Sequence, residues 1–177
     1  MKRNLLNLAV MFLMIALLAS CSSSDEKTAT DNAEMMAETQ APAGTGAKFM
    51  ALDIDGTFHT LEQYKGKPLI LNFWGTWCPP CRKELPDLKK IYEEYKPQGL
   101  EIIGLAVNDT PEKVRKFSKD SGLNWVMLIA NRESAMSYQI GTGVPVTIFL
   151  DKDGNEVSRA IGARSYEFFK GEVEKII

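Results

Sequence analysis

The fold is decided by the stretch from Leu69 to Pro86, which reads LILNFWGTWCPPCRKELP. Residues 69–74 form an apolar run that is too short for a buried helix, which indicates a strand inside a sheet. From residue 79 to residue 95 apolar side chains recur at helical spacing, which predicts an amphipathic helix. Cys78 and Cys81 lie where the turn between the two becomes the helix. The sequence therefore predicts a strand–turn–helix unit with two cysteines at its junction.

Further strands and helices can be assigned on both sides of this unit. The pair Asp55-Gly56 is a hairpin signal between two short apolar segments. Thr110 and Pro111 are typical of the cap and first turn of a helix, and Gly122 is typical of its end. The other expected elements are strands at 49–52, 57–60, 100–107, 125–129, 146–150 and 156–161, a helix at 132–140, and a closing helix capped by Ser165 that runs to the end. This order predicts an α/β fold with a mixed central sheet flanked by helices.

The first 46 residues are expected to lie outside the folded domain. Residues 1–20 combine Lys2 and Arg3, a short apolar run and small residues, which are the three parts of a secretory signal peptide. A transmembrane anchor is the alternative interpretation of this run. Residues 22–46 are rich in Ser, Thr, Ala and acidic residues and cannot bury enough surface to fold, so they predict a flexible tether or a plain spacer. Residues 47–177 remain, which is 131 of the 177 residues and a usual size for one domain.

Cys21 lies directly behind the leader. The stretch Leu18-Ala19-Ser20-Cys21 resembles the lipobox of bacterial lipoproteins, in which the cysteine is lipidated and becomes the new N-terminus. The resemblance implies a lipid anchor in the bacterial cell envelope, with the domain facing the periplasm or another extracytoplasmic space. Ser22 follows in place of an aspartate, which by resemblance to diderm lipoproteins favours the outer membrane. The alternative is an unmodified cysteine at this position by chance.

The charge of the domain restricts its partners. The first 46 residues hold three of the 21 basic and five of the 23 acidic residues, which leaves 18 of each in the domain. A neutral domain without a basic cluster argues against a nucleic-acid partner. We expect a monomer.

With Cys21 set aside, Cys78 and Cys81 are the only cysteines of the domain. A helix N-terminus carries a partial positive charge and free amide groups, and both stabilise a thiolate at Cys78. The thiolate is the species that attacks a disulfide, and Cys81, one turn further on, can then close a ring with Cys78 and release a mixed disulfide. Because this pair stores two electrons, no bound cofactor is needed.

Three other uses of two cysteines compete with redox exchange. A structural disulfide across so short a loop would constrain little of the unfolded chain. A tetrahedral zinc site needs two more ligands, and the only other candidate is His59, which we expect on the surface. A copper carrier would need a histidine or methionines nearby, and we expect the scattered Met50, Met127 and Met136 to fill the core. We therefore expect no metal.

The residues from Asn72 to Pro86 resemble the active-site stretch of the TlpA/ResA-type thiol–disulfide oxidoreductases of the thioredoxin superfamily, and the resemblance extends over about residues 47–177. It implies a thioredoxin fold with an N-terminal β-hairpin and an inserted helix–strand unit at about 111–129. It also implies a protein-disulfide oxidoreductase in which Cys78 attacks and Cys81 resolves.

Two more parts of the site follow from the resemblance. Residues 143–147, GVPVT, resemble the cis-proline loop, so Val144–Pro145 is expected to be cis, to face the cysteines and to pair with a substrate strand. A proline that merely begins an edge strand is the alternative. We expect Trp74 in the core, and Trp77 to shield Cys78 and to contact partners.

Thioredoxin itself has a buried aspartate at the position of Asn72, which cannot relay a proton. The TlpA/ResA-type proteins instead have a glutamate three residues after the second cysteine, and Glu84 matches it. One helical turn separates Glu84 from Cys81, so a partly buried Glu84 could take the proton from Cys81. The alternative is that Glu84 joins Arg82 and Lys83 on a solvated face.

The sequence thus predicts a membrane-anchored enzyme that reduces disulfides of envelope proteins. By resemblance, apocytochromes c are one substrate class, and an inner-membrane thiol reductant supplies the electrons. An outer-membrane location would make that donor harder to reach. Two alternatives are a thioredoxin-fold thiol peroxidase, although the chain lacks a Pro-x-x-x-Thr-x-x-Cys arrangement, and a non-enzymatic module that binds a metal or a partner.

Overall fold

The structure is a computed structural model that describes residues 49–177. The predicted signal peptide at 1–20, the lipidation site at Cys21 and the tether up to residue 46 lie outside the described residues. In the described part no helix has the length and apolar character needed to cross a membrane.

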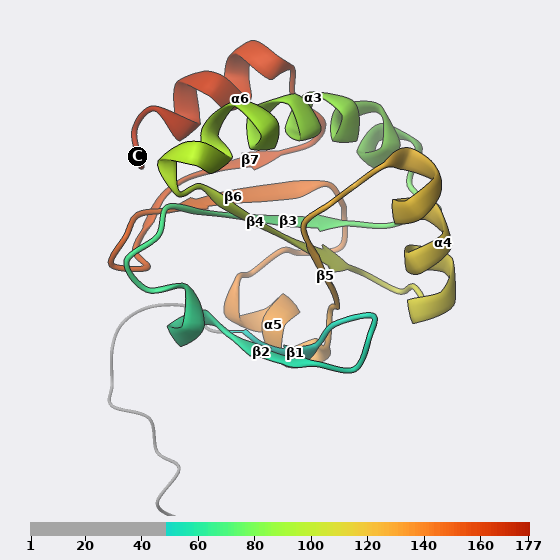
Figure 1. The fold of residues 1–177 in the computed structure, drawn as a ribbon. Coiled ribbons are helices and arrows are strands. Elements are labelled where there is room, and N and C mark those ends of the chain that lie inside the picture. The colour runs from blue at the N-terminus through green and yellow to red at the C-terminus, as the bar shows by residue number, and fades with distance from the viewer. Residues whose placement is uncertain (1–48) are drawn as a thin grey trace, which may run out of the picture. The chain divides into compact units, whose positions relative to one another are not determined.

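The centre of the fold is a five-stranded sheet in the order β5-β4-β3-β6-β7 (Figure 1). The central strand β3 pairs in parallel with β4 and antiparallel with β6, while β4 pairs in parallel with β5 and β6 pairs antiparallel with β7. The bounds are β3 Leu69–Trp74, β4 Glu101–Ala106, β5 Val126–Ile129, β6 Val146–Leu150 and β7 Glu156–Ile161. The predicted mixed sheet is confirmed.

Helices and a hairpin cover the two faces of this sheet. Helices α3 (Pro79–Tyr95) and α6 (Tyr166–Val173) pack side by side on one face (Figure 1). The other face carries α5 (Arg132–Ser137) and the predicted hairpin of β1 (Met50–Leu52) and β2 (Phe58–Thr60). The inserted helix α4 (Pro111–Ser121) leads into β5, and the short 3-10 helices η1 (Leu61–Tyr64) and η2 (Lys96–Gln98) follow β2 and α3.

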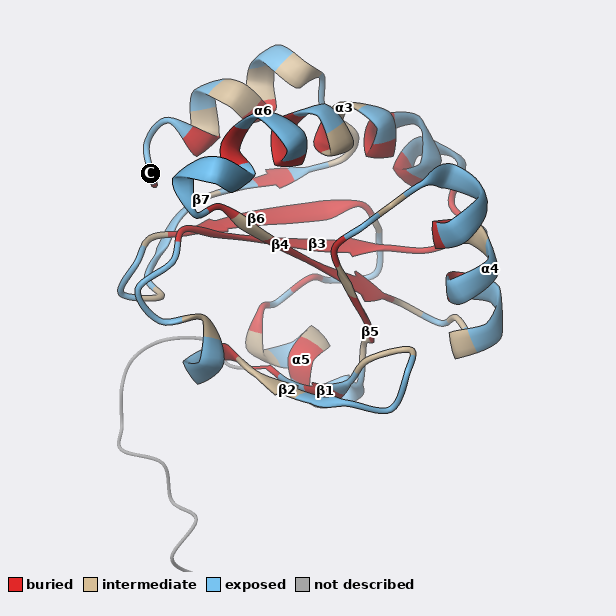
Figure 2. Cartoon of the chain, in the orientation of Figure 1, coloured by how far each residue is buried: buried red, intermediate tan, exposed pale blue. Residues whose placement is uncertain are grey.

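The sheet separates the hydrophobic core into two parts, one on each face. All six residues of β3 are buried (Figure 2). Because successive side chains of a strand point to opposite faces of the sheet, both faces of β3 are covered. Ile70 and Trp74 pack with α3 and α6, whereas Leu71 and Phe73 pack toward the hairpin and α5. Such a strand reads as a continuous apolar run, which is why the sequence predicted its bounds correctly.

Two predicted helix ends are wrong. The helix expected at 132–140 ends at Ser137, because Gln139 takes a left-handed conformation with φ of 50°. The closing helix ends at Val173, before the end of the chain, and Ser165 stands at its N-cap position without a capping hydrogen bond from its side chain.

The prediction for the methionines is wrong at two of three positions. Met127 is buried, but Met50 and Met136 are 46% and 64% exposed. On β1 the buried side chain is Ala51, so its neighbour Met50 must point outward.

Gly104 on β4 provides a test of the packing. A Cβ atom at this position would lie 2.5 Å from Met127 Sδ and 3.0 Å from Trp74 Nε1. We expect Gly104→Ala to lower the free energy of unfolding of the oxidised protein by about 1–3 kcal/mol, because the surrounding core has no room for a methyl group. The measurement is urea unfolding followed by tryptophan fluorescence.

The matched control is Gly171→Ala in α6, where nothing lies within 4 Å of the added Cβ atom. Because alanine favours a helix over glycine, this variant should be more stable by about 0.5–1 kcal/mol. Equal effects of the two substitutions would contradict the packing described for Gly104.

Candidate active site

The two cysteines lie at the junction between β3 and the start of α3. Cys78 is the N-cap residue of α3, and Pro79 and Pro80 follow as its first helical residues. Prolines suit these positions because the first amide groups of a helix have no intrahelical partner. The Cys81 amide remains free to donate, and it donates to Cys78 Sγ at 3.2 Å. A sulfur that accepts a hydrogen bond at a helix N-terminus is stabilised in its thiolate form.

Cys78 and Cys81 form a disulfide in this structure. Both cysteines are buried, and Cys78, at 2% exposed against 0% for Cys81, retains the small exposed surface of the pair. The predicted pairing within the CPPC motif is therefore present.

The cis-proline loop faces this disulfide. The Val144–Pro145 peptide bond is cis, as predicted, and Pro145 directly precedes β6. The Val144 carbonyl oxygen lies 3.5 Å from Cys78 Sγ. Val144 and Cys78 lie far apart in the sequence. They meet because β6, which follows Val144, pairs with β3, which leads into the turn before Cys78.

The turn before Cys78 is held by the loop after β4. Asp109 Oδ2 accepts a hydrogen bond from the Thr76 amide at 2.7 Å, and Trp77 Nε1 donates to the Val107 carbonyl at 3.0 Å. Gly75 is required here because a Cβ atom would lie 2.6 Å from Trp77 Nε1. The Trp77 side chain is 54% exposed, and its contact with partners stays a prediction.

Asp109 was not identified from the sequence. Its place beside Thr110-Pro111 indicates only the start of a helix. The signal that could have found it is its position just past β4, at the same sheet edge as the cysteines.

Glu84 is buried, with 1% of its surface exposed, so it does not join a solvated face with Arg82 and Lys83. Its Oε1 accepts from Asn72 Nδ2 at 3.0 Å, and its Oε2 accepts from the Arg164 amide at 3.2 Å. Burial raises the pKa of Glu84 from 4.5 to about 7, although both hydrogen bonds and the Arg164 charge favour the ionised form. A carboxyl group with this pKa can both accept and release a proton near neutrality.

Asn72 holds this carboxyl group from β3. Its Nδ2 also donates to Thr147 Oγ1 on β6 at 2.9 Å, which the register explains because Asn72 pairs with Thr147. An asparagine cannot relay a proton, as the sequence indicated, but here it fixes the position of the glutamate that can. Thr147 is a member of the site that the sequence did not single out.

His59 is not a surface residue, so that prediction is wrong. Its side chain is 15% exposed, with Nε2 at 3.0 Å from Asp53 Oδ2 and Nδ1 at 2.9 Å from Tyr64 Oη. The hairpin folds back on η1, and the imidazole is enclosed between the two elements. His59 therefore ties the hairpin together and is no part of the cysteine site.

A redox-active pair at a helix N-terminus, opposite a cis-proline, on this sheet topology defines a thioredoxin-fold thiol–disulfide oxidoreductase. The model of the AhpC/TSA family matches residues 39–159. The chain is 34% identical over 177 residues to the thiol-disulfide oxidoreductase ResA of Bacillus thuringiensis strain Al Hakam, with 99% of each chain covered. The chain belongs to the ResA-type thiol–disulfide oxidoreductases of the AhpC/TSA family.

Further comparisons agree. The ResA of Geobacillus thermodenitrificans is 34% identical over 137 residues, which cover 77% of this chain and 78% of the relative. A crystal structure of a thiol:disulfide interchange protein from Chlorobium tepidum TLS has a TM-score of 0.69 and 29% identity, and covers 77% of this chain and 98% of its own. The thioredoxin fold predicted from the sequence is confirmed.

The raised pKa of Glu84 predicts a pH-dependent stability. Below about pH 4.5 the carboxyl group is protonated in the folded and in the unfolded chain. Between about pH 4.5 and about pH 7 only the unfolded chain loses the proton, so the free energy of unfolding falls as pH rises, by about 3 kcal/mol in all. Above about pH 7 this contribution stays constant.

The matched variant is Glu84→Gln, which resembles the protonated carboxyl group and cannot ionise. Urea unfolding of both oxidised proteins between pH 4 and pH 8.5 should give a difference in stability that moves in favour of the variant as pH rises. A difference that does not change with pH would contradict the account of Glu84.

Proposed function

We propose that this protein is a lipid-anchored reductase of protein disulfides in the bacterial cell envelope. The observation that carries the proposal is the arrangement at the N-terminus of α3. The Cys78 sulfur lies between the Cys81 amide and the Val144 carbonyl, and the buried Glu84 follows one turn beyond Cys81.

The first step is an attack by the Cys78 thiolate on a disulfide of the client polypeptide. A bond forms between Cys78 Sγ and one client sulfur, and the other client sulfur leaves as a thiolate. The backbone of Val144 pairs with the client segment next to this mixed disulfide, and the exposed Trp77 ring also contacts the client.

The second step releases the client. Glu84 takes the proton from Cys81, and the Cys81 thiolate attacks Cys78 Sγ, so the second client sulfur leaves. Two electrons have passed from the protein to the client, and the protein holds the Cys78–Cys81 disulfide. No bound cofactor takes part, because a thiol reductant from the inner membrane restores the dithiol.

The proposed location and clients follow from the resemblance. Lipidation of Cys21 would attach the domain to a membrane, with the outer membrane favoured in a diderm organism, and apocytochromes c are the client class it suggests. We propose that the domain acts as a monomer without nucleic acid.

Trapping tests the exchange mechanism. In a Cys81→Ser variant the second step cannot occur, so mixed disulfides through Cys78 should accumulate with envelope proteins and should disappear on treatment with a reductant. The measurement is non-reducing electrophoresis and mass spectrometry of the captured proteins. Cys78→Ser is the matched control and should capture none.

Two outcomes would contradict the proposal. One is that Cys81→Ser captures no protein. The other is that the reduced protein consumes hydrogen peroxide much faster than it reduces a protein disulfide, which would favour the peroxidase alternative.

The lipid anchor is tested separately. The full chain, expressed in a bacterium with a lipoprotein pathway, should remain with the membranes, whereas Cys21→Ser should release it to the soluble extracytoplasmic fraction. A single acyl chain holds a protein to a membrane only marginally. Stable retention of the wild type with the membranes would therefore indicate several acyl chains on Cys21. Equal distribution of both proteins would contradict lipidation of Cys21.

A further inference from the structure

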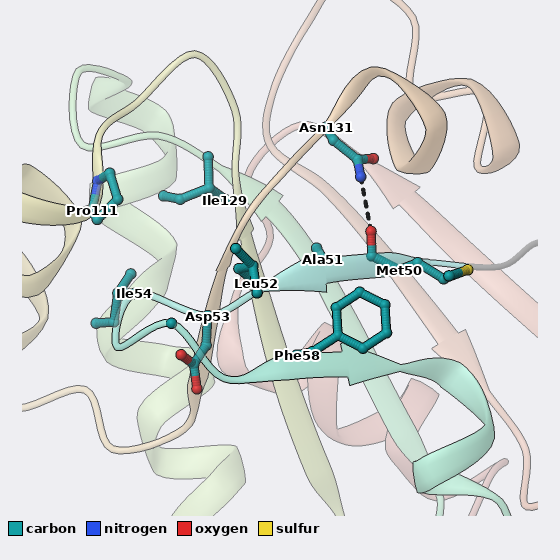
Figure 3. A pocket seen from close by; sticks show the side chains of 10 residues that line it. Met50, Ala51, Leu52, Asp53, Ile54, Phe58, Pro111, Ile129 and Asn131 are labelled. Atoms are coloured by element: carbon teal, nitrogen blue, oxygen red, sulfur yellow. Dashed lines mark hydrogen bonds between the residues drawn. The ribbon is translucent and has the colours of Figure 1, made fainter.

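An apolar groove of about 580 Å³ lies between the N-terminal hairpin, the start of α4 and the end of β5 (Figure 3). Six apolar side chains line it: Met50, Leu52, Ile54, Phe58, Pro111 and Ile129. Its size falls within the range of pockets that bind ligands or peptide side chains.

The outer face of the hairpin is unusually apolar. Met50, Leu52 and Phe58 are 46%, 55% and 49% exposed, and all three line the groove. Single exposed apolar residues are common, but three on one small hairpin around a groove indicate a binding surface.

The polar groups of the lining are already occupied. Asp53 Oδ1 accepts from the Asp55 and Thr57 amides, and its Oδ2 contacts His59. Asn131 donates to the Met50 carbonyl at 2.8 Å and accepts from the Ser134 amide at 2.8 Å (Figure 3). The groove therefore offers apolar contact and few hydrogen bonds, which fits an uncharged apolar segment and disfavours an anion or a sugar.

The groove lies next to the loop that holds the turn before Cys78. Asp109, which holds the Thr76 amide beside the cysteines, lies two residues before Pro111, which lines the groove. In the sheet Trp74 pairs with Ala106, and Ala106 pairs with Ile129. Two strand spacings therefore separate Trp74 at the end of β3 from Ile129 in the groove lining, a distance of about 10 Å. Cys78 lies four residues beyond Trp74, which adds up to about 13 Å of extended chain.

We propose that this groove binds an apolar, extended segment of the client polypeptide while its disulfide reacts at Cys78. The inference rests on the proposed function. A chain extended at about 3.3 Å per residue crosses about 10–23 Å in about three to seven residues, so the bound segment lies about three to seven residues from the client cysteine. A client that has not yet folded exposes such segments, so the groove selects unfolded clients.

The test compares two synthetic peptides, each with one cysteine joined to glutathione by a disulfide. One peptide carries Leu, Val and Phe about three to seven residues on both sides of the cysteine, and the other carries Ser there. The reduced wild-type protein should reduce the apolar peptide at least about tenfold faster in kcat/KM, the scale of burying one large apolar side chain. Leu52→Ser with Phe58→Ser should abolish this preference.

Glutathione disulfide alone is the common control substrate, and both proteins should reduce it at the same rate. Val157→Ser on β7 is the matched variant, because Val157 is 43% exposed and does not line the groove. It should retain the preference of the wild type.

The outcomes separate the two proposals. Equal rates of the wild type on both peptides would overturn the proposal that the groove binds the client. This comparison does not depend on the folding of any variant. Sedimentation could also show that the wild type is a dimer and that the double variant Leu52→Ser, Phe58→Ser is a monomer. This result would overturn the client proposal, because a second copy of the chain would then occupy the groove. Reduction of neither peptide nor glutathione disulfide would instead overturn the proposed function.

Discussion

The site depends on the position of β3 in the middle of the sheet. This strand is buried along its whole length, with a parallel neighbour on one side and an antiparallel neighbour on the other. A slip of one residue would move every side chain to the opposite face, so the register is strongly determined. Because β3 ends at Trp74, the register also determines where Cys78 lies, and the pairing with β6 brings Val144 to it.

The same strand carries the polar part of the site into the core. Asn72, Thr147 and Glu84 are all buried, and Asn72 Oδ1 has no hydrogen-bond partner. A buried acceptor without a partner costs about 1–3 kcal/mol, and a buried carboxylate costs more. This chain of side chains therefore lowers stability, and the benefit we propose for it is a carboxyl group that takes a proton from Cys81, one turn away. Stability and chemistry are in conflict at this position.

The sequence predicted most of the fold because its signals are local. The run at 69–74, the pair Asp55-Gly56 and the sequence Thr110-Pro111 each determine a strand, a turn or a helix start through their own residues, and the structure has each of them. The helix expected at 132–140 was too long because Gln139 breaks it without a glycine or proline to mark the place.

The parts of the site that the sequence missed depend on contacts across the fold. Asp109 contacts a residue 33 positions earlier, and Thr147 meets Asn72 over a separation of 75 positions. Neither contact leaves a pattern in the neighbouring residues. His59 was placed on the surface for the same reason, because its enclosure by Asp53 and Tyr64 arises only when the hairpin folds back on η1. Glu84 was found because the TlpA/ResA-type proteins, which the active-site stretch resembles, have a glutamate three residues after the second cysteine, although its burial could not be derived from that spacing.

The central claim is that the end of β3 presents Cys78, and not Cys81, as the reacting sulfur. The most direct measurement is alkylation of the fully reduced protein with a limiting amount of iodoacetamide near neutral pH, followed by peptide mapping. We expect the first modified residue to be Cys78, because it retains the small exposed surface of the pair and its sulfur accepts a hydrogen bond from the Cys81 amide at the helix N-terminus. Modification of Cys81 first, or of both residues at equal rates, would contradict it.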